Sequence, residues 1–190
     1  EEVDLFFCSK KGLVKRTRLG DYRNIRTSGL RAYDCAEGDE LLTVRKTRTE
    51  QHVLITTRAG KCIRFQGINE NGELEVRHMG RVARGVRGIK LKEQDEIAGL
   101  EMLEADAEML LLTVTENGYG KRTAIEKYRV QGRGGQGVIN MVVDERNGRV
   151  VGSVQVHDDD QLMMMTNTGR VIKIPVTNIR ETQSRAAKGV

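Results

Sequence analysis

The residues best suited to do chemistry in this sequence are arginines and lysines gathered in four short loops that also contain glycine. The loops are predicted at residues 23–31 (RNIRTSGLR), 77–90 (RHMGRVARGVRGIK), 129–137 (RVQGRGGQG) and 180–189 (RETQSRAAKG). Their cations can neutralise phosphates, and their glycines let main-chain N–H groups come close to a phosphate oxygen. The loops therefore predict a polyanion-binding rim without any element that reads bases. The alternative interpretation is that these arginines only solvate turns.

The candidate polyanion-binding side chains are the cations of these loops and the basic pairs that follow two turn glycines. They are Lys15, Arg16, Arg23, Arg26, Arg31, Arg77, Arg81, Arg84, Arg87, Lys90, Lys121, Arg122, Arg129, Arg133, Arg185 and Lys188. Isolated hairpin cations such as Lys10 and Arg58 are equally well explained by solvation of a turn. The net charge of +5 and the isoelectric point of about 9.2 fit a polyanion binder. Residues 1–95 hold 20 Lys and Arg against 14 Asp and Glu, so the excess lies in the first half.

Metal, nucleotide and catalytic sites find no support in the sequence. His52, His78 and His157 are scattered and have no second ligand at the spacing of a zinc site. The aspartates of residues 158–160 lack the glycine and distal glutamate of a calcium loop, so we interpret them as an acidic turn. No Gly-Lys-Ser/Thr follows the glycines of residues 132–137, which argues against a Walker-type ATP site. No catalytic residue, metal site or cofactor is therefore predicted.

Aromatic residues and methionines are expected to be structural. Aromatic residues make up 4% of the chain and tryptophan is absent, which argues against base-stacking platforms. Tyr22 and Tyr128 directly precede two of the basic loops, so we expect them at the loop roots rather than as nucleophiles. The run of methionines at residues 163–165 is predicted to lie in a strand and to fill gaps in the core.

The cysteines and the hydropathy of the chain limit its possible cellular location. Cys8, Cys35 and Cys62 are odd in number and form no CxxC pair, so we expect buried or half-buried thiols rather than disulfides or a zinc ribbon. The acidic opening residues do not form a signal peptide, and no run of about 18 apolar residues predicts a membrane span. A soluble, intracellular protein is expected.

The basic loops are positioned by a repeat. An apolar run, a polar turn with glycine and a basic, apolar run recur around Gly12, Gly60, Gly118 and Gly169, so one unit is about 50 residues long. Short apolar runs bounded by Gly, Asn or Asp predict strands joined in hairpins. An acidic turn then leads to another apolar strand. Four short strands per unit are expected, which is the composition of a propeller blade.

The repeat predicts one all-β domain fragment over residues 1–190. Its approximate blades are 3–50, 51–108, 109–160 and an incomplete 161–190. We interpret the open end as a fragment of a longer protein, because a free edge would expose strand hydrogen-bonding groups. Residues 94–109 taken alone fit an amphipathic helix. We reject that helix because the aligned segments around Leu41 and Val150 are predicted as strands.

Three segments of the third unit carry a resemblance to a known family. Asn117–Ala124 (NGYGKRTA), Gln131–Gly137 (QGRGGQG) and Glu145–Gly148 (ERNG) resemble the C-terminal domain of the bacterial DNA gyrase A protein. The resemblance extends over essentially the whole chain. It implies a β-pinwheel, a propeller-like ring of four-stranded blades that exchange strands, with three full repeats and part of a fourth present here.

The family's signature is a seven-residue box of glutamine, two cations, two glycines, a cation and glycine. The matching residues in this chain are Gln131, Arg133, Gly134, Gly135 and Gly137. The box is degenerate, because glycine and glutamine replace cations at its second and sixth positions. Residues 84–88 and 184–189 resemble further degenerate copies. The intact box of the family usually lies in the first blade, so the resemblance implies that it is absent from this chain.

The resemblance implies a non-catalytic domain that binds, bends and wraps duplex DNA around its basic rim. ATP hydrolysis and strand cleavage would belong to other parts of a type II topoisomerase, whose holoenzyme introduces negative supercoils. The implied partners are double-stranded DNA, the gyrase B protein and the remainder of the gyrase A protein, with no membrane. The alternatives are the corresponding domain of topoisomerase IV and a protein-docking propeller. A docking propeller would show an exposed apolar or aromatic patch.

Overall fold

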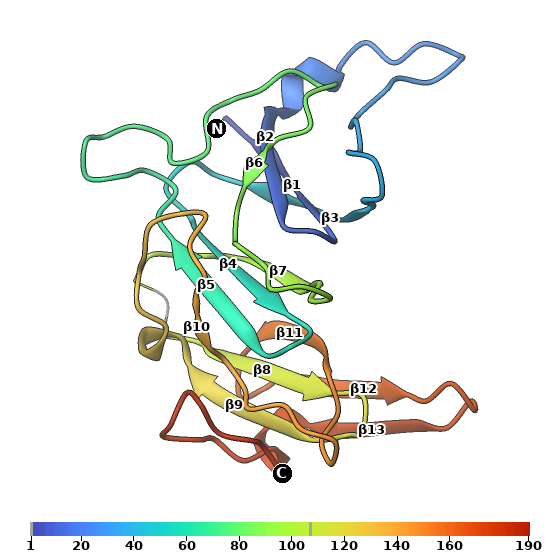
Figure 1. The fold of residues 1–190 in the computed structure, drawn as a ribbon, viewed down its shortest axis with the longest axis vertical. Helices are drawn as coiled ribbons and strands as arrows, with labels where there is room; N and C mark the ends of the chain where they lie inside the picture. Colours follow the sequence, from blue (N-terminus) through green and yellow to red (C-terminus); the bar gives the residue numbers. More distant parts are fainter. Residues whose placement is uncertain (1, 107) are drawn as a thin grey trace.

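The computed structural model describes residues 2–106 and 108–190, which consist mainly of short antiparallel strands in four sheets (Figure 1). Helical structure in this part of the chain is confined to three 3-10 segments: η1 (Leu19–Tyr22), η2 (Ile125–Lys127) and η3 (Val176–Asn178). The sheets follow one another in sequence order along the longest axis, with the N-terminal sheet uppermost in Figure 1. The predicted all-β architecture is confirmed.

The first two sheets each have four strands, and one outer strand of each comes from the following unit. The first sheet has the order β3 (Leu41–Thr47), β1 (Asp4–Ser9), β2 (Leu13–Arg18), β6 (Val86–Arg87). The second has the order β10 (Val138–Ile139), β5 (Lys61–Phe65), β4 (His52–Thr57), β7 (Ile97–Leu103). The strands β6 and β10 are therefore exchanged between neighbouring sheets, and sheets do not coincide with units of the sequence.

The third and fourth sheets are smaller. The third has the order β11 (Val150–Val156), β8 (Leu110–Thr115), β9 (Gly120–Ala124). The main chain of Val190 exchanges two hydrogen bonds with Gly120 of β9, at 2.8 and 3.0 Å. The fourth unit thus reaches back to the third sheet as β6 and β10 reach back to theirs. The fourth sheet is the hairpin of β12 (Gln161–Met165) and β13 (Val171–Pro175).

The four predicted hairpins are confirmed, and glycine sets the turn of each. The turn glycines Gly12, Gly60, Gly118 and Gly169 all have φ between +82° and +88°, a conformation that side chains with a Cβ rarely adopt. Residues 97–103 form the strand β7, so the rejection of a helix there is also confirmed. Ile97 and Leu100, which match a helical period, are both buried in one core cluster, and the pairing of β7 with β4 shifts register between them.

The core lies between successive sheets. One buried cluster joins the first two sheets through residues such as Phe6, Val14 and Ile55. A second joins the next pair of sheets, where Leu54 packs with Tyr128 and their neighbours. A third cluster holds the terminal hairpin against the third sheet. Each sheet is therefore stabilised by its neighbours, as expected for a blade that cannot bury its faces alone.

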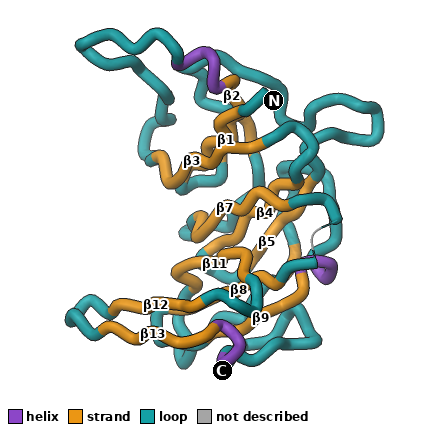
Figure 2. The backbone as a smooth tube through the Cα atoms, turned by 180° about the vertical axis from the view of Figure 1, so that it is seen from behind, coloured by secondary structure: helices purple, strands orange, loops and turns teal. Residues whose placement is uncertain are grey.

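The sheets are arranged like the blades of a propeller. β7 packs beside both β3 and β11, and Figure 2 shows these three strands in succession. The strands β2, β5 and β9 make no comparable approach to one another within residues 2–106 and 108–190. The sheets therefore diverge from a first edge, where β3, β7 and β11 lie close together, toward a second edge, where β2, β5 and β9 lie. We call the second edge, along which residues 77–90, 129–137 and 180–189 run, the loop edge.

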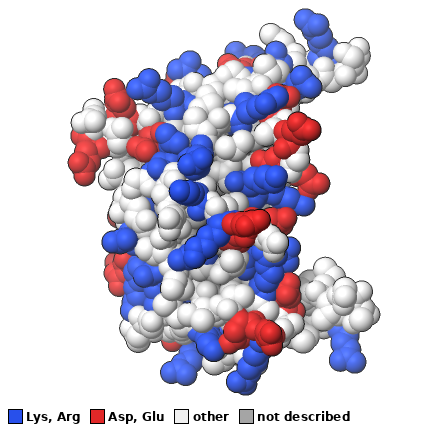
Figure 3. All heavy atoms as spheres, in the orientation of Figure 1, with Lys and Arg blue, Asp and Glu red and all other residues white. Residues whose placement is uncertain are grey.

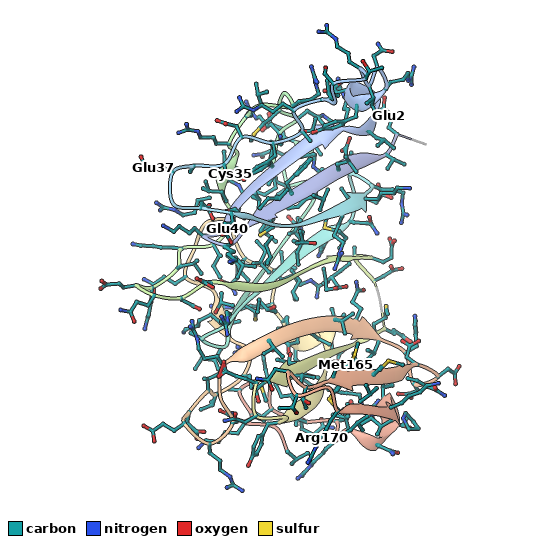
Figure 4. The ribbon with its side chains drawn as sticks, turned by 90° about the vertical axis from the view of Figure 1, so that its right-hand side faces the viewer. Glu2, Cys35, Glu37, Glu40, Met165 and Arg170 are labelled. Carbon is teal, nitrogen blue, oxygen red and sulfur yellow. The ribbon has the colours of Figure 1, made fainter. Side chains whose placement is uncertain are left out.

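Two expectations about buried side chains are wrong. Met163 and Met165 lie in a strand as predicted, but they are 58% and 74% exposed, because no sheet covers the outer face of the terminal hairpin within the described residues. Cys35 is exposed because it lies in a surface loop (Figure 4). Cys8 and Cys62 are buried as expected, and burial raises the pKa of both thiols to about 12.

Candidate nucleic-acid interface

Three of the basic loops are laid along the outermost full strand of the preceding sheet in the same way. Each loop begins with an amide that donates a 2.8 Å hydrogen bond to the carbonyl of a buried arginine. The pairs are Met79 to Arg16, Gln131 to Arg64, and Thr182 to Arg122. Each loop then crosses and pairs antiparallel to the same strand, through β6, β10 or Val190. The basic loops therefore occupy equivalent positions at the loop edge.

A glycine lies at the crossing point of each loop, and the local geometry requires it. Gly85, Gly137 and Gly189 have φ values of +93°, +72° and +77°. A Cβ on them would lie 2.3, 2.2 and 2.8 Å from the main-chain oxygens of Val14, Cys62 and Gly120. The last glycine of the box-like motif thus allows the exchanged strand to cross close to its neighbour.

This equivalence corrects the assignment of one box copy. Because Gly85 is equivalent to Gly137, the segment that matches the box-like loop is 79–85, and the sequence-based assignment of 84–88 is wrong. Counting back from the crossing glycine makes Arg81, Arg133 and Arg185 equivalent residues. The interleaved glycines of 84–88 misled the motif comparison, because only Gly85 takes the crossing conformation.

The loops contact one another and form a continuous band. Tyr33 donates its hydroxyl proton to the carbonyl of Arg84 (3.2 Å), which joins the segment that follows the first loop to the second loop. The amide of Gly134 donates to Gly88 and the Nη1 of Arg133 donates to Arg87, which joins the second loop to the third. The guanidinium of Arg185 donates to the carbonyl of Ile139, next to the third loop.

Most of the candidate loop cations lie at the surface of this band. The exposed ones are Arg23, Arg26, Arg31, Arg77, Arg84, Arg87, Lys90, Arg129 and Lys188. Arg81, Arg133 and Arg185 are half-buried. Figure 3 shows lysine and arginine side chains from the top to the bottom of the molecule, with carboxylates between them. The arrangement can hold an extended polyanion across several sheets.

Carboxylates already engage some of these cations. The shortest of these ion pairs are Lys188–Asp144 at 2.6 Å and Arg84–Asp34 at 3.0 Å, and Arg133 lies 3.7 Å from Glu75. Among the residues that the structure describes, Arg23, Arg26, Arg81, Arg87, Lys90, Arg129 and Arg185 have no ion-pair partner. The unpaired set is spread over all of the loops.

Comparison with known proteins gives the family. Residues 4–48, 51–104, 110–157 and 160–190 match the model of the DNA gyrase C-terminal domain, a β-propeller. The chain belongs to this family. It is 40% identical to the DNA gyrase A protein of Staphylococcus epidermidis and 41% identical to that of Staphylococcus aureus, over all 190 residues. It spans about a fifth of the length of these relatives.

Solved structures show the same fold. The C-terminal domain of DNA topoisomerase IV superposes with a TM-score of 0.89 at 24% identity, covering 99% of this chain and 56% of that one. The DNA gyrase A C-terminal domain superposes with a TM-score of 0.84 at 24% identity, covering 100% of this chain and 60% of that one. With the strand exchange described above, these matches confirm the predicted β-pinwheel.

Four candidate residues are wrong as DNA contacts in this gyrase C-terminal domain fold. Lys15, Arg16, Lys121 and Arg122 are 0–7% exposed. They lie on β2 and β9 beneath the loop of the following unit. Arg16 pairs with buried Asp4 at 2.9 Å, and Arg122 donates to the carbonyl of Ile179 and to Asp158 at 2.8 and 2.7 Å. The sequence predicts that a basic pair after a turn faces solvent, but the exchanged loop covers it.

Sequence reasoning missed cations beside the second loop. Lys11 and Lys92 line an open cleft of about 650 Å³ together with Arg87 and Lys90. Lys61 lies beside the same segment, at a smaller neighbouring pocket. Lys11 and Lys61 flank the glycines of two hairpin turns, so their position next to the glycine was the available signal. The cleft also contains carboxylates, including Asp39 and Glu96, which lower its net charge.

The described residues offer no metal-binding cluster. Within residues 2–106 and 108–190, no group of three His, Cys, Asp or Glu side chains is arranged to hold a metal ion. His157 and its neighbouring aspartates form a turn, in which the Asp160 carboxylate accepts a hydrogen bond from the His157 amide (2.8 Å). The structure of these same residues contains no helix that is long and apolar enough to cross a membrane.

Proposed function

We propose that this chain binds, bends and wraps duplex DNA without sequence preference along the loop edge. The observation that carries the proposal is the continuous band of basic loops at the edge where the sheets diverge. A duplex that follows the band from sheet to sheet must curve. The loops offer guanidinium, ammonium and main-chain N–H groups, which suit phosphates and carry no base code.

The proposed role in the whole protein follows from the family. We place the chain within a gyrase A protein that works with a gyrase B protein in the bacterial cytoplasm. The wrapped duplex would present an adjacent DNA segment in a positive crossover. ATP hydrolysis and strand cleavage elsewhere in the complex would then convert the crossover into negative supercoils. This chain would contribute no catalytic residue and no cofactor.

Sequence identity favours gyrase over topoisomerase IV. The chain is 40–41% identical to gyrase A proteins over all 190 residues. The solved topoisomerase IV and gyrase structures share 24% each, support the fold alone and do not distinguish the two. The low aromatic content and the cationic loop edge favour DNA over a docked protein as the main partner.

A salt titration tests DNA binding. Fluorescence anisotropy of labelled duplexes should show an affinity that falls steeply with salt, because each phosphate contact adds about −0.9 to the log–log slope. With several loops engaged, we expect a slope of several units and equal affinity for unrelated sequences. A negligible slope, or a strong preference for one sequence, would contradict the proposal.

A further inference from the structure

Two buried lysines, Lys15 and Lys121, have equivalent contacts in alternate units. Each follows its turn glycine by three residues and is 0% exposed. The Nζ of Lys15 donates to the main-chain oxygen of Arg81 (2.5 Å), and the Nζ of Lys121 donates to that of Arg185. Arg81 and Arg185 are the equivalent arginines of the second and fourth basic loops. Each lysine therefore binds the basic loop of the next unit from below.

The surroundings of Lys15 fix its position. Its Nζ lies 4.5 Å from the ring centroid of Phe7 and 4.9 Å from that of Tyr33, and it also donates to the carbonyl of Ala32 (3.0 Å). Burial lowers its pKa to about 8, against an opposing effect of Asp34. Faces of two aromatic rings and two carbonyl oxygens are all suitable neighbours for an ammonium group. The first and second loop regions are both attached to this one cation.

Lys121 lies in a different setting with the same contact to a loop. Its Nζ donates to the hydroxyl of Thr123 at 3.1 Å as well as to the carbonyl of Arg185. Burial lowers its pKa to about 8, Cys62 opposes this effect and Arg185 adds to it. The common feature of the two sites is thus the carbonyl of the loop arginine.

The second unit shows that the contact is not a general need of the fold. Ile63 occupies the equivalent position and is fully buried. The third loop above it makes the same main-chain hydrogen bond as the other two loops, from Gln131 to Arg64. It is held in addition by main-chain hydrogen bonds from Gly134 to Gly88 and from Lys90 to Gly135. Glycine-rich backbone and a buried lysine are therefore two alternative ways to fix a basic loop.

We propose that Lys15 and Lys121 are positioning residues that hold the second and fourth basic loops in their DNA-binding conformation without touching DNA. The consequence for DNA rests on the proposed function, whereas the fixing of the loops does not. Without the ammonium group, the carbonyls of Arg81 and Arg185 lose a buried hydrogen-bond donor, and the loops open more often. Removal of Lys15 acts on the second loop and on the segment around Ala32, whereas removal of Lys121 acts on the fourth loop.

Site-resolved proteolysis tests this assignment, because trypsin cleaves after the very arginines that the lysines hold. In Lys15→Met, cleavage of the chain after Arg81 should accelerate about tenfold, while cleavage after Arg185 and Arg133 stays within about twofold of the wild type. Lys121→Met should accelerate cleavage after Arg185 by a similar factor and leave Arg81 unchanged. Each variant serves as the other's control, and Arg133, above Ile63, serves as a control for both.

Conservative variants keep the test decisive if a methionine variant unfolds. Lys15→Arg and Lys121→Arg retain donors and should keep cleavage after Arg81 and Arg185 within about threefold of wild type. Unchanged cleavage in the methionine variants, or equal acceleration at all three arginines in folded variants, would overturn the assignment. Weaker DNA binding by Lys15→Met would support the link to DNA. Failure of the wild type to bind DNA would instead refute the proposed function and leave the proteolysis result standing.

Discussion

The second and third basic loops cross the preceding sheet in the same way, but different contacts hold them in place. Residues 77–90 supply five predicted cations and rely on a buried lysine beneath them, whereas residues 129–137 supply two cations and rely on glycine-rich backbone. The side chain of Arg133 is partly used to bind the carbonyl of Arg87 and approaches Glu75. The loop that best matches the family box is therefore not the one with the most available charge.

This difference distinguishes the residues of the motif that determine the loop conformation from those that supply its charge. The final glycine of the motif is required by the strand crossing in both loops, so it is a determinant of the fold. The cations between the glycines vary without any change in the crossing. We infer that resemblance to the box reports how a loop is folded, and that DNA affinity follows the number of unpaired cations.

The crossing glycines should give the largest effect. Gly85→Ala and Gly137→Ala each force a Cβ into a positive-φ conformation and against a main-chain oxygen. We expect each to lower the free energy of unfolding by about 3 kcal/mol in chemical denaturation. Gly132→Ala is the matched control, because no atom lies within 4 Å of its added Cβ. Equal stability of Gly137→Ala and Gly132→Ala would show that the crossing does not depend on glycine.

Neutralising loop cations should separate the two loops in DNA binding. Arg87→Gln with Lys90→Gln removes two unpaired cations and should reduce the salt slope by about 1.8, at 0.9 per contact. Arg129→Gln with Arg133→Gln should reduce it by only about 0.9, because Arg133 is engaged within the protein. Anisotropy titrations over a salt series measure both.

The control for these pairs lies at the other edge of the same sheet. Arg45→Gln with Lys46→Gln removes two exposed cations from β3, which is opposite β6 in the first sheet, and should leave the slope unchanged. Equal losses for all three pairs would mean that only net charge matters. A larger loss from the third loop would mean that glycine-dependent shape outweighs charge.

Releasing a paired cation should give the smallest effect. Asp34→Asn removes the partner of Arg84 and should tighten DNA binding about threefold, since exposed ion pairs contribute about 0.2–1 kcal/mol. In an Arg84→Gln background the same change should give a smaller gain. An identical gain in both backgrounds would show that Asp34 does not act through Arg84, which leaves its second partner, Arg31 at 3.8 Å, or the overall field of the protein.

The hairpins could be predicted from local sequence patterns. Burial that depends on contacts between units could not, because local patterns do not contain those contacts. The four turn glycines and the apolar runs beside them sufficed for the hairpins, and comparison between units identified β7 as a strand. Burial of Lys15 and Arg122 arises from a loop that lies more than 50 residues further along the chain, so no local pattern contains it. The exposure of Met163 has the same origin, because it depends on which sheet packs next.

Bending of the duplex tests the central claim most directly, and ligase-catalysed ring closure of DNA measures it. A fragment of about 150 base pairs, close to the persistence length, closes slowly unless it is bent. At saturating chain we expect the closure rate to rise at least tenfold, to keep that rise with the Arg45→Gln, Lys46→Gln control, and to lose most of it with Arg87→Gln, Lys90→Gln. Saturated binding with an unchanged closure rate would contradict the account, because the loop edge would then be an adhesive surface that does not curve DNA.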